Sequence, residues 1–140
     1  MARVRAFDAR AMERFSAKGV AMSYQSGKGI RGEGRQFILF LPRFKISPEE
    51  DREVVCDEQD EFLLTVLLTQ HFGGYTVDEA FLQGTGPREG KRETNVHKKI
   101  TVIAARSPRA VAYFRGLCEE LQKCSGEEQV FVIQQDIVIL

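Results

Sequence analysis

The chain has 140 residues, 43% of them hydrophobic, and its 20 Lys and Arg balance its 20 Asp and Glu. A chain of this length can bury about 68% of the surface that its unfolded form exposes. Zero net charge gives no general attraction to nucleic acid or membrane, and no apolar run approaches the roughly 18 residues that cross a bilayer. The three cysteines lack a disulfide-framework spacing, so we expect free thiols and a cytoplasmic location.

The first 35 residues form a segment of their own, distinct from the rest of the chain. Its apolar residues recur at helical spacing, at Val4, Phe7, Ala11 and Phe15. This spacing predicts an amphipathic helix over 4–18, ended by Gly19. The glycine-rich stretch 26–35 predicts a connector without regular structure. We therefore expect an N-terminal addition over 1–35 and an α+β domain over 36–140.

The domain is predicted to begin with a strand and a helix. The apolar run 36–44 indicates a buried strand closed by Pro42. An acidic approach follows, in which Asp57 or Asp60 is suited to cap the next helix. The predicted inner stripe of that helix consists of Phe62, Leu63, Val66 and Leu67. A second apolar stripe consists of Leu64, Leu68 and Phe72.

The stretch His71–Val77, HFGGYTV, combines a histidine, two glycines and two hydroxyls. We interpret it as a helix end followed by a strand, with Gly73 in the left-handed conformation, and not as a ligand cradle. Two strands over 75–84 and 93–105 are then predicted, joined by the turn 84–92. Ser107 and Pro108 predict a second helix start, and 128–140 reads as the last strand.

This order of elements, strand-helix-strand-strand-helix-strand, predicts a ferredoxin-like sandwich with both helices on one face. The first and last strands are apolar on both sides. Leaving the helix-free face in water would forgo about 1.5–3 kcal/mol for each exposed aliphatic side chain. We therefore expect this face to be covered by the N-terminal helix or by a second copy, and we favour a homodimer.

Several familiar chemistries do not fit the sequence. Gly27, Gly29 and Gly32 have dinucleotide-loop spacing, but a strand follows where a helix is needed. In the turn 84–92, Arg92 stands where a phosphate-binding loop has Ser or Thr, and no helix follows. His71, His97 and Glu93 lie too far apart in the predicted topology for one metal ion. The strand ITVIAA lacks the aromatic residues that would bind RNA, and no Ser or Cys has an evident base. We expect no metal, no cofactor and no nucleic acid.

Two candidate sites remain. The basic turn residues Arg88, Lys91 and Arg92 are suited to an anion. A cleft at the same end of the fold would have a polar lining of Glu93, Asn95, His97, Gln134 and Gln135. The first three share one side of their strand.

The chain resembles small bacterial ferredoxin-like domains of unknown function over about residues 60–135. The resemblance rests on the stretch LLTQHFGGYTV, a later Glu before the third strand, and EEQVFV at the last strand. It implies the fold and supplies no activity. The favoured function is a non-catalytic binding module that recognises a protein or small molecule. The alternative is a small dimeric enzyme with a cleft on the third strand around Glu93 and His97.

Overall fold

The computed structural model describes Arg10 and the ranges 32–49, 51–85, 92–126 and 130–140. The predicted N-terminal helix, apart from Arg10, and the basic turn 86–91 lie outside these residues. Neither helix within the described ranges has the length and apolar character needed to span a membrane.

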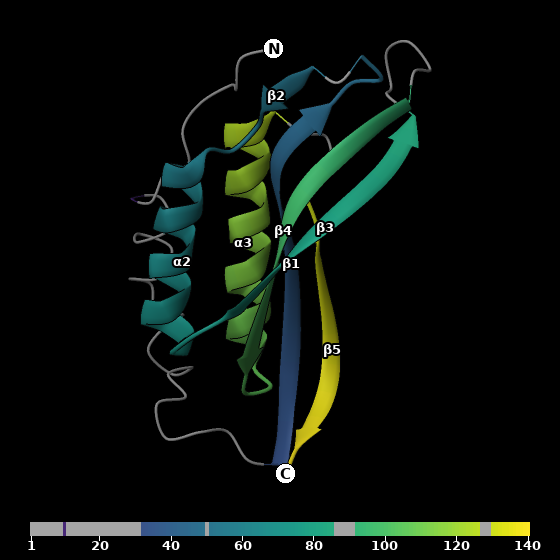
Figure 1. Ribbon diagram of the computed structural model, residues 1–140. Coiled ribbons are helices and arrows are strands. Elements are labelled where there is room, and N and C mark those ends of the chain that lie inside the picture. Colours follow the sequence, from purple (N-terminus) through teal and green to yellow (C-terminus); the bar gives the residue numbers. More distant parts are fainter. Residues whose placement is uncertain (1–9, 11–31, 50, 86–91, 127–129) are drawn as a thin grey trace.

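The core of the molecule is one antiparallel sheet with two helices against one side of it (Figure 1). Its elements are β1 (Gly32–Ile46), β2 (Arg52–Val54), α2 (Glu58–Phe72), β3 (Thr76–Thr85), β4 (Arg92–Ala104), α3 (Pro108–Ser125) and β5 (Val132–Ile139). The strands run in the order β2-β1-β4-β3, and β5 also pairs with β1. The prediction of a mixed fold with an antiparallel sheet and two helices is confirmed.

Strand β1 begins at Gly32, earlier than the predicted Gln36. Its first residues pair with the end of β5, from Gly32 opposite Ile139 to Arg35 opposite Asp136. This pairing outweighs the low strand propensity of the glycines. A Cβ added at Gly34 would lie 3.1 Å from the end of the Ile139 side chain, so a larger residue here would have to push that side chain aside by a few tenths of an ångström.

The short strand β2 was not predicted. It pairs with the far end of β1, from Phe44 opposite Val54 to Ile46 opposite Arg52. Because β2 and β5 pair with different parts of the same edge of β1, the sheet has five strands. It thereby differs from the expected four-stranded sheet. The sequence SPEEDREVVC concealed β2 because its acids also suit a helix approach.

Helix α2 begins as predicted, and its buried face differs in part from the predicted one. The Asp57 carboxylate accepts a hydrogen bond from the Asp60 N–H, and the Asp60 carboxylate accepts one from the Asp57 N–H. The predicted second stripe is buried, since Leu64, Leu68 and Phe72 are almost inaccessible, and Leu67 of the predicted inner stripe is buried with it. Phe62, which was predicted to face inward, is 60% exposed. The apolar residues surround this helix, so their periodicity did not select one face.

The stretch His71–Val77 is a helix end, as predicted. Helix α2 ends at Phe72, and Gly73 has φ 84° and donates its N–H to the Thr69 carbonyl. Strand β3 then begins at Thr76. The second helix is also bounded as predicted. Ser107 caps α3, Pro108 occupies its first turn, and Gly126 ends it with φ 71°.

The core lies between the helices and the sheet. β1 contributes Phe37, Leu39 and Leu41, and β4 contributes Ile100, Val102 and Ala104. The rings of Phe37 and Phe114 stack with centroids 4.3 Å apart, which joins the sheet to α3. Aromatic pairs of this kind add about 0.5–1.5 kcal/mol beyond their buried area.

The opposite side of the sheet, here called the helix-free face, carries Ile38, Phe40, Ile103, Phe131 and Ile133. Phe131, Ile133 and Ile103 are between 42% and 46% exposed. Ile38, on the same face, is only 9% exposed. The predicted apolar character of this face is therefore present, and its covering stays a prediction.

Gly73 provides a test of the helix end. We expect Gly73→Ala to lower the free energy of unfolding by about 1 kcal/mol, because an alanine is strained in the left-handed region. Gly74→Ala is the matched control, since a Cβ there meets nothing within 4 Å and its φ is not positive. Urea unfolding followed by circular dichroism measures both. Equal losses in the two variants would contradict the role of the Gly73 backbone.

Candidate functional site

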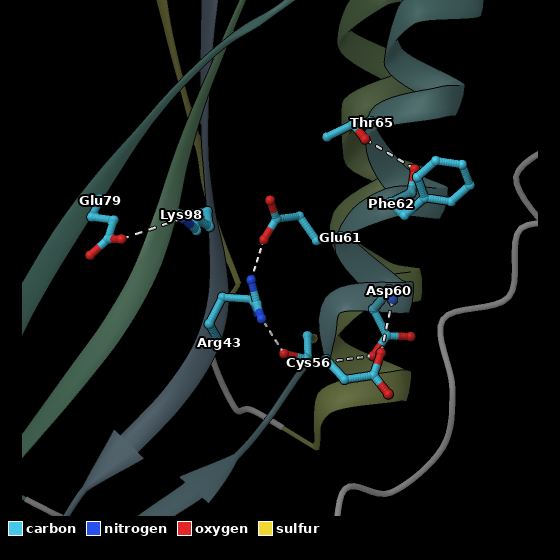
Figure 2. A network of polar contacts seen from close by, with 9 residues as sticks. Arg43, Cys56, Asp60, Glu61, Phe62, Thr65, Glu79 and Lys98 are labelled. Carbon is cyan, nitrogen blue, oxygen red and sulfur yellow. Dashed lines mark hydrogen bonds and ion pairs between the residues drawn. The ribbon is translucent and has the colours of Figure 1, made fainter.

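The layer between the sheet and α2 contains charged side chains where apolar ones are the rule. Arg43 and Glu61 form an ion pair in this layer, and Lys98 and Glu79 form a second, more exposed pair on neighbouring strands; the four are here called the charged cluster (Figure 2). They come from β1, α2, β3 and β4, so four separate elements supply them. Buried charge is more informative about function than exposed apolar residues, because its desolvation is costly.

Arg43 is the buried end of the charged cluster. It lies at an irregularity of β1 between Pro42 and Phe44 and is 7% exposed. Its Nε donates to the Cys56 carbonyl at 2.8 Å, and its Nη1 pairs with the Glu61 carboxylate. Figure 2 shows the guanidinium between these two partners. The arginine thus joins β1 to the start of α2.

Lys98 and Glu79 form the accessible end. They are direct neighbours on β4 and β3, with Nζ and Oε1 3.5 Å apart. Lys98 shares the inward side of β4 with Val96 and Ile100. The Lys98 side chain is 26% exposed and that of Glu79 is 56% exposed. A dissolved molecule can therefore reach a carboxylate and an ammonium here, beside a fixed buried ion pair.

A second concave feature lies between α3 and the β5 edge of the sheet. This edge groove has a volume of about 320 Å³ and is lined by Phe37, Val111, Phe114, Arg115, Cys118, Glu119, Val132 and Gln134. Burial, with a smaller contribution from Glu119, raises the pKa of the Cys118 thiol to about 11. The thiol is therefore protonated near neutral pH and is a poor nucleophile there.

The structure separates the residues of the predicted polar cleft. Asn95 and His97 lie on the helix-free side of β4, and the His97 ring lies 6.4 Å from that of Phe40. Gln134 and Gln135 point to opposite sides of β5, and Gln134 lines the edge groove. Gln135 pairs with Gln36, whereas His97 pairs with Pro42, roughly 20 Å farther along β1.

The other predicted site residues are described less fully. Glu93 pairs with Gly84 and Arg92 with Thr85 near the end of the β3–β4 pair. Arg88 and Lys91 lie outside the described residues. His71 contacts Tyr113 with ring centroids 5.1 Å apart, and burial lowers the pKa of its imidazole. Among the described residues, no group of three His, Cys, Asp or Glu is placed to hold a metal ion.

Sequence reasoning did not find the charged cluster. The parity of β4 contained part of the signal, because Lys98 interrupts a row of inward apolar residues. Arg43 could not be placed in the same way, since the irregularity after Pro42 breaks the alternation. Glu61 belongs to the acidic stretch around the start of α2, which sequence reasoning related only to the start of that helix.

Comparisons with known proteins give one structural likeness. No family model matches the chain, and no curated protein sequence matches it. A solved structure described as a phage SAM lyase in complex with S-methyl-5'-thioadenosine is similar, with a TM-score of 0.52 and 16% sequence identity. The match covers 79% of this chain and 85% of that one. At this identity the likeness shows a shared fold.

The two ends of the charged cluster are expected to differ in their effect on stability. Glu61→Gln leaves the Arg43 guanidinium buried without its counter-ion, so we expect a loss of about 2–3 kcal/mol in the free energy of unfolding. Glu79→Gln removes an exposed ion pair and is expected to cost less than about 1 kcal/mol. Urea unfolding measures both. A Glu79 loss as large as that of Glu61 would contradict the graded burial.

The thiol of Cys118 gives a second test. We expect iodoacetamide to alkylate it slowly at pH 8 in the native protein, with the rate rising about tenfold per pH unit toward the pKa of about 11. Peptide mass spectrometry separates Cys118 from Cys56 and Cys124, which are buried. In urea the rate should level off near pH 9. A native rate that levels off there would contradict the raised pKa.

Proposed function

We propose that this chain is a small enzyme that cleaves a sulfonium nucleoside of the S-adenosylmethionine type and releases a thioether nucleoside. The fold likeness to the SAM lyase, over 79% of the chain, is the observation that carries this proposal. It favours the enzyme alternative over the non-catalytic binding module.

The chemistry of a sulfonium fits the groups in the charged cluster. When the bond between sulfur and the amino-acid carbon breaks, sulfur keeps the electron pair and leaves as a neutral thioether. No general acid has to protonate this leaving group. The remaining four-carbon fragment balances its charge by closing on its own carboxylate or by losing a proton. Such a reaction depends mainly on orientation and on charges placed beside the substrate.

We assign roles to the accessible end of the charged cluster. The Glu79 carboxylate faces the positive sulfonium and ammonium groups, and the Lys98 ammonium pairs with the substrate carboxylate. Their 3.5 Å contact and partial exposure support this arrangement, because a ligand can exchange with an exposed ion pair at little cost. The buried Arg43–Glu61 pair acts as a positioning element beneath them.

We further propose that the fold is a ferredoxin-like sandwich extended by β2 and that two copies associate through the helix-free face. The neighbouring central strands β1 and β4, with both helices on one side, support the first proposal. The exposed Ile103, Phe131 and Ile133 support the second. Analytical ultracentrifugation tests the association of two copies, and a monomer at micromolar concentration would contradict that association.

The enzymatic proposal is tested by incubating the purified protein with S-adenosylmethionine and measuring S-methyl-5'-thioadenosine by liquid chromatography. We expect release by the native protein and a drop in kcat/KM of roughly 100-fold for Glu79→Gln. Lys98→Met should raise KM for the same substrate. Lys123→Met, whose side chain is 61% exposed on α3, is the control and should leave the rate unchanged.

The outcomes of this assay test the proposed reaction and its assignment to the charged cluster separately. Absence of thioether nucleoside from the native protein would overturn the lyase proposal. Release that is unchanged in both Glu79→Gln and Lys98→Met would keep the reaction and overturn its assignment to the charged cluster. Circular dichroism of each variant confirms that the fold is retained.

A further inference from the structure

We propose that the edge groove is a binding site for a free α-amino acid with an apolar side chain, separate from the charged cluster. This inference goes beyond the proposed lyase reaction and does not depend on it. The groove combines an apolar floor with one cation, one anion and one amide at its rim. These are the groups that a zwitterion with an apolar tail requires.

The floor of the groove is preformed. Phe37 and Phe114, each 2% exposed, stack with an interplanar angle of 14°. Val111 and Val132 stand on the two sides of them, from α3 and β5. The stacked rings are covered, so the half-buried Val111 and Val132 supply the accessible apolar surface, against which a thioether or aromatic side chain gains apolar burial. A preformed slot also lowers the ordering cost of binding.

The rim supplies charges of both signs. Arg115 and Glu119 are four residues apart on α3, so both lie on one side of the helix over the groove. Gln134 lies across from them on β5. The Arg115 guanidinium is suited to an α-carboxylate as a two-pronged donor. The Glu119 carboxylate and the Gln134 amide oxygen are suited to accept from an α-ammonium.

The size and charge of the groove discriminate between ligand classes. Its volume of about 320 Å³ is near the lower limit of typical small-molecule pockets. Glu119 opposes a nucleotide phosphate or another polyanion at the rim. A zwitterion satisfies both Arg115 and Glu119 at once, whereas a plain hydrocarbon leaves each of them without a ligand partner. An amino acid of methionine or phenylalanine size therefore fits best.

The two sites are distant from each other. Phe37 lies in the floor of the groove, whereas Lys98 lies opposite Leu41, four positions later on β1 and roughly 13 Å away along an extended strand, and Glu79 lies one strand farther. A free amino acid of methionine size is too short to span this separation. Occupation of the groove therefore leaves Glu79 and Lys98 accessible.

Isothermal titration of the full chain at neutral pH with L-methionine and L-phenylalanine tests the inference. We expect binding of both and none of glycine, which lacks the apolar tail. Arg115→Gln and Glu119→Gln should each weaken methionine binding about tenfold or more, because a charged hydrogen bond is lost. Lys123→Gln, on α3 away from the groove lining, is the matched control and should bind as the native protein does.

Ligand analogues that lack one charged group test the contacts proposed for Arg115 and Glu119 by changing the ligand instead of the protein. N-acetyl-L-methionine lacks the ammonium and should be insensitive to Glu119→Gln, and L-methionine methyl ester should be insensitive to Arg115→Gln. Lack of binding by both amino acids would overturn the inference. It would also be overturned if S-adenosylmethionine displaced methionine competitively and Arg115→Gln abolished thioether release, since the groove would then be the substrate site. Binding in a protein without lyase activity would support the inference alone.

Discussion

The position of β1 in the middle of the sheet is the constraint on which the remaining structure depends. One face of this strand supplies Phe37, Leu39 and Leu41 to the core. Its two edges pair with β4 on one side and with β5 and β2 on the other. Because β1 is longer than β5, its two ends have different surroundings. The edge groove lies beside the part of β1 that pairs with β5, next to α3. The charged cluster lies farther along β1, past the residues that pair with β5.

The irregularity between Pro42 and Phe44 determines which side chains of the C-terminal part of β1 face α2. It leaves Arg43 inside the layer against α2, where the Cys56 carbonyl and the Glu61 carboxylate hold it. Burying such a pair gives little net stability compared with an apolar pair of similar volume. The pair instead fixes the relative position of β1 and α2, since the guanidinium donates hydrogen bonds only in a defined geometry. The start of α2 is therefore held against β1 beside the β3–β4 pair.

The sequence predicted features that local chemistry determines. Asp57, Gly73 and Ser107 gave correct helix ends because capping depends on neighbours within a few residues. The buried face of α2 was mistaken in part because apolar residues surround it, and the sheet decides which of them are covered. Here tertiary contacts, and not local propensity, decide the outcome. The strand β2 was missed for a different reason, because it has only three residues and the acids around it also suit the approach to a helix.

The candidate site was predictable only in fragments, for the same reason. In the edge groove, Gln134 was selected from the sequence, but Arg115 and Glu119 were not. Their proximity to Gln134 depends on where α3 lies against β5. Lys98 could have been selected from its inward parity on β4. Arg43 could not, since an inserted residue reverses the alternation that such an argument uses.

No combination of acid, base and nucleophile is evident in the sequence, and the leaving group of the proposed reaction explains why none is needed. A search for an acid, a base and a nucleophile assumes that the departing group needs a proton or that the protein forms a bond to the substrate. A sulfonium needs neither, because it departs as a neutral thioether. Under the proposed lyase reaction, oriented charges such as the Glu79–Lys98 pair are the groups required, and such a pair leaves no recognisable motif in the sequence.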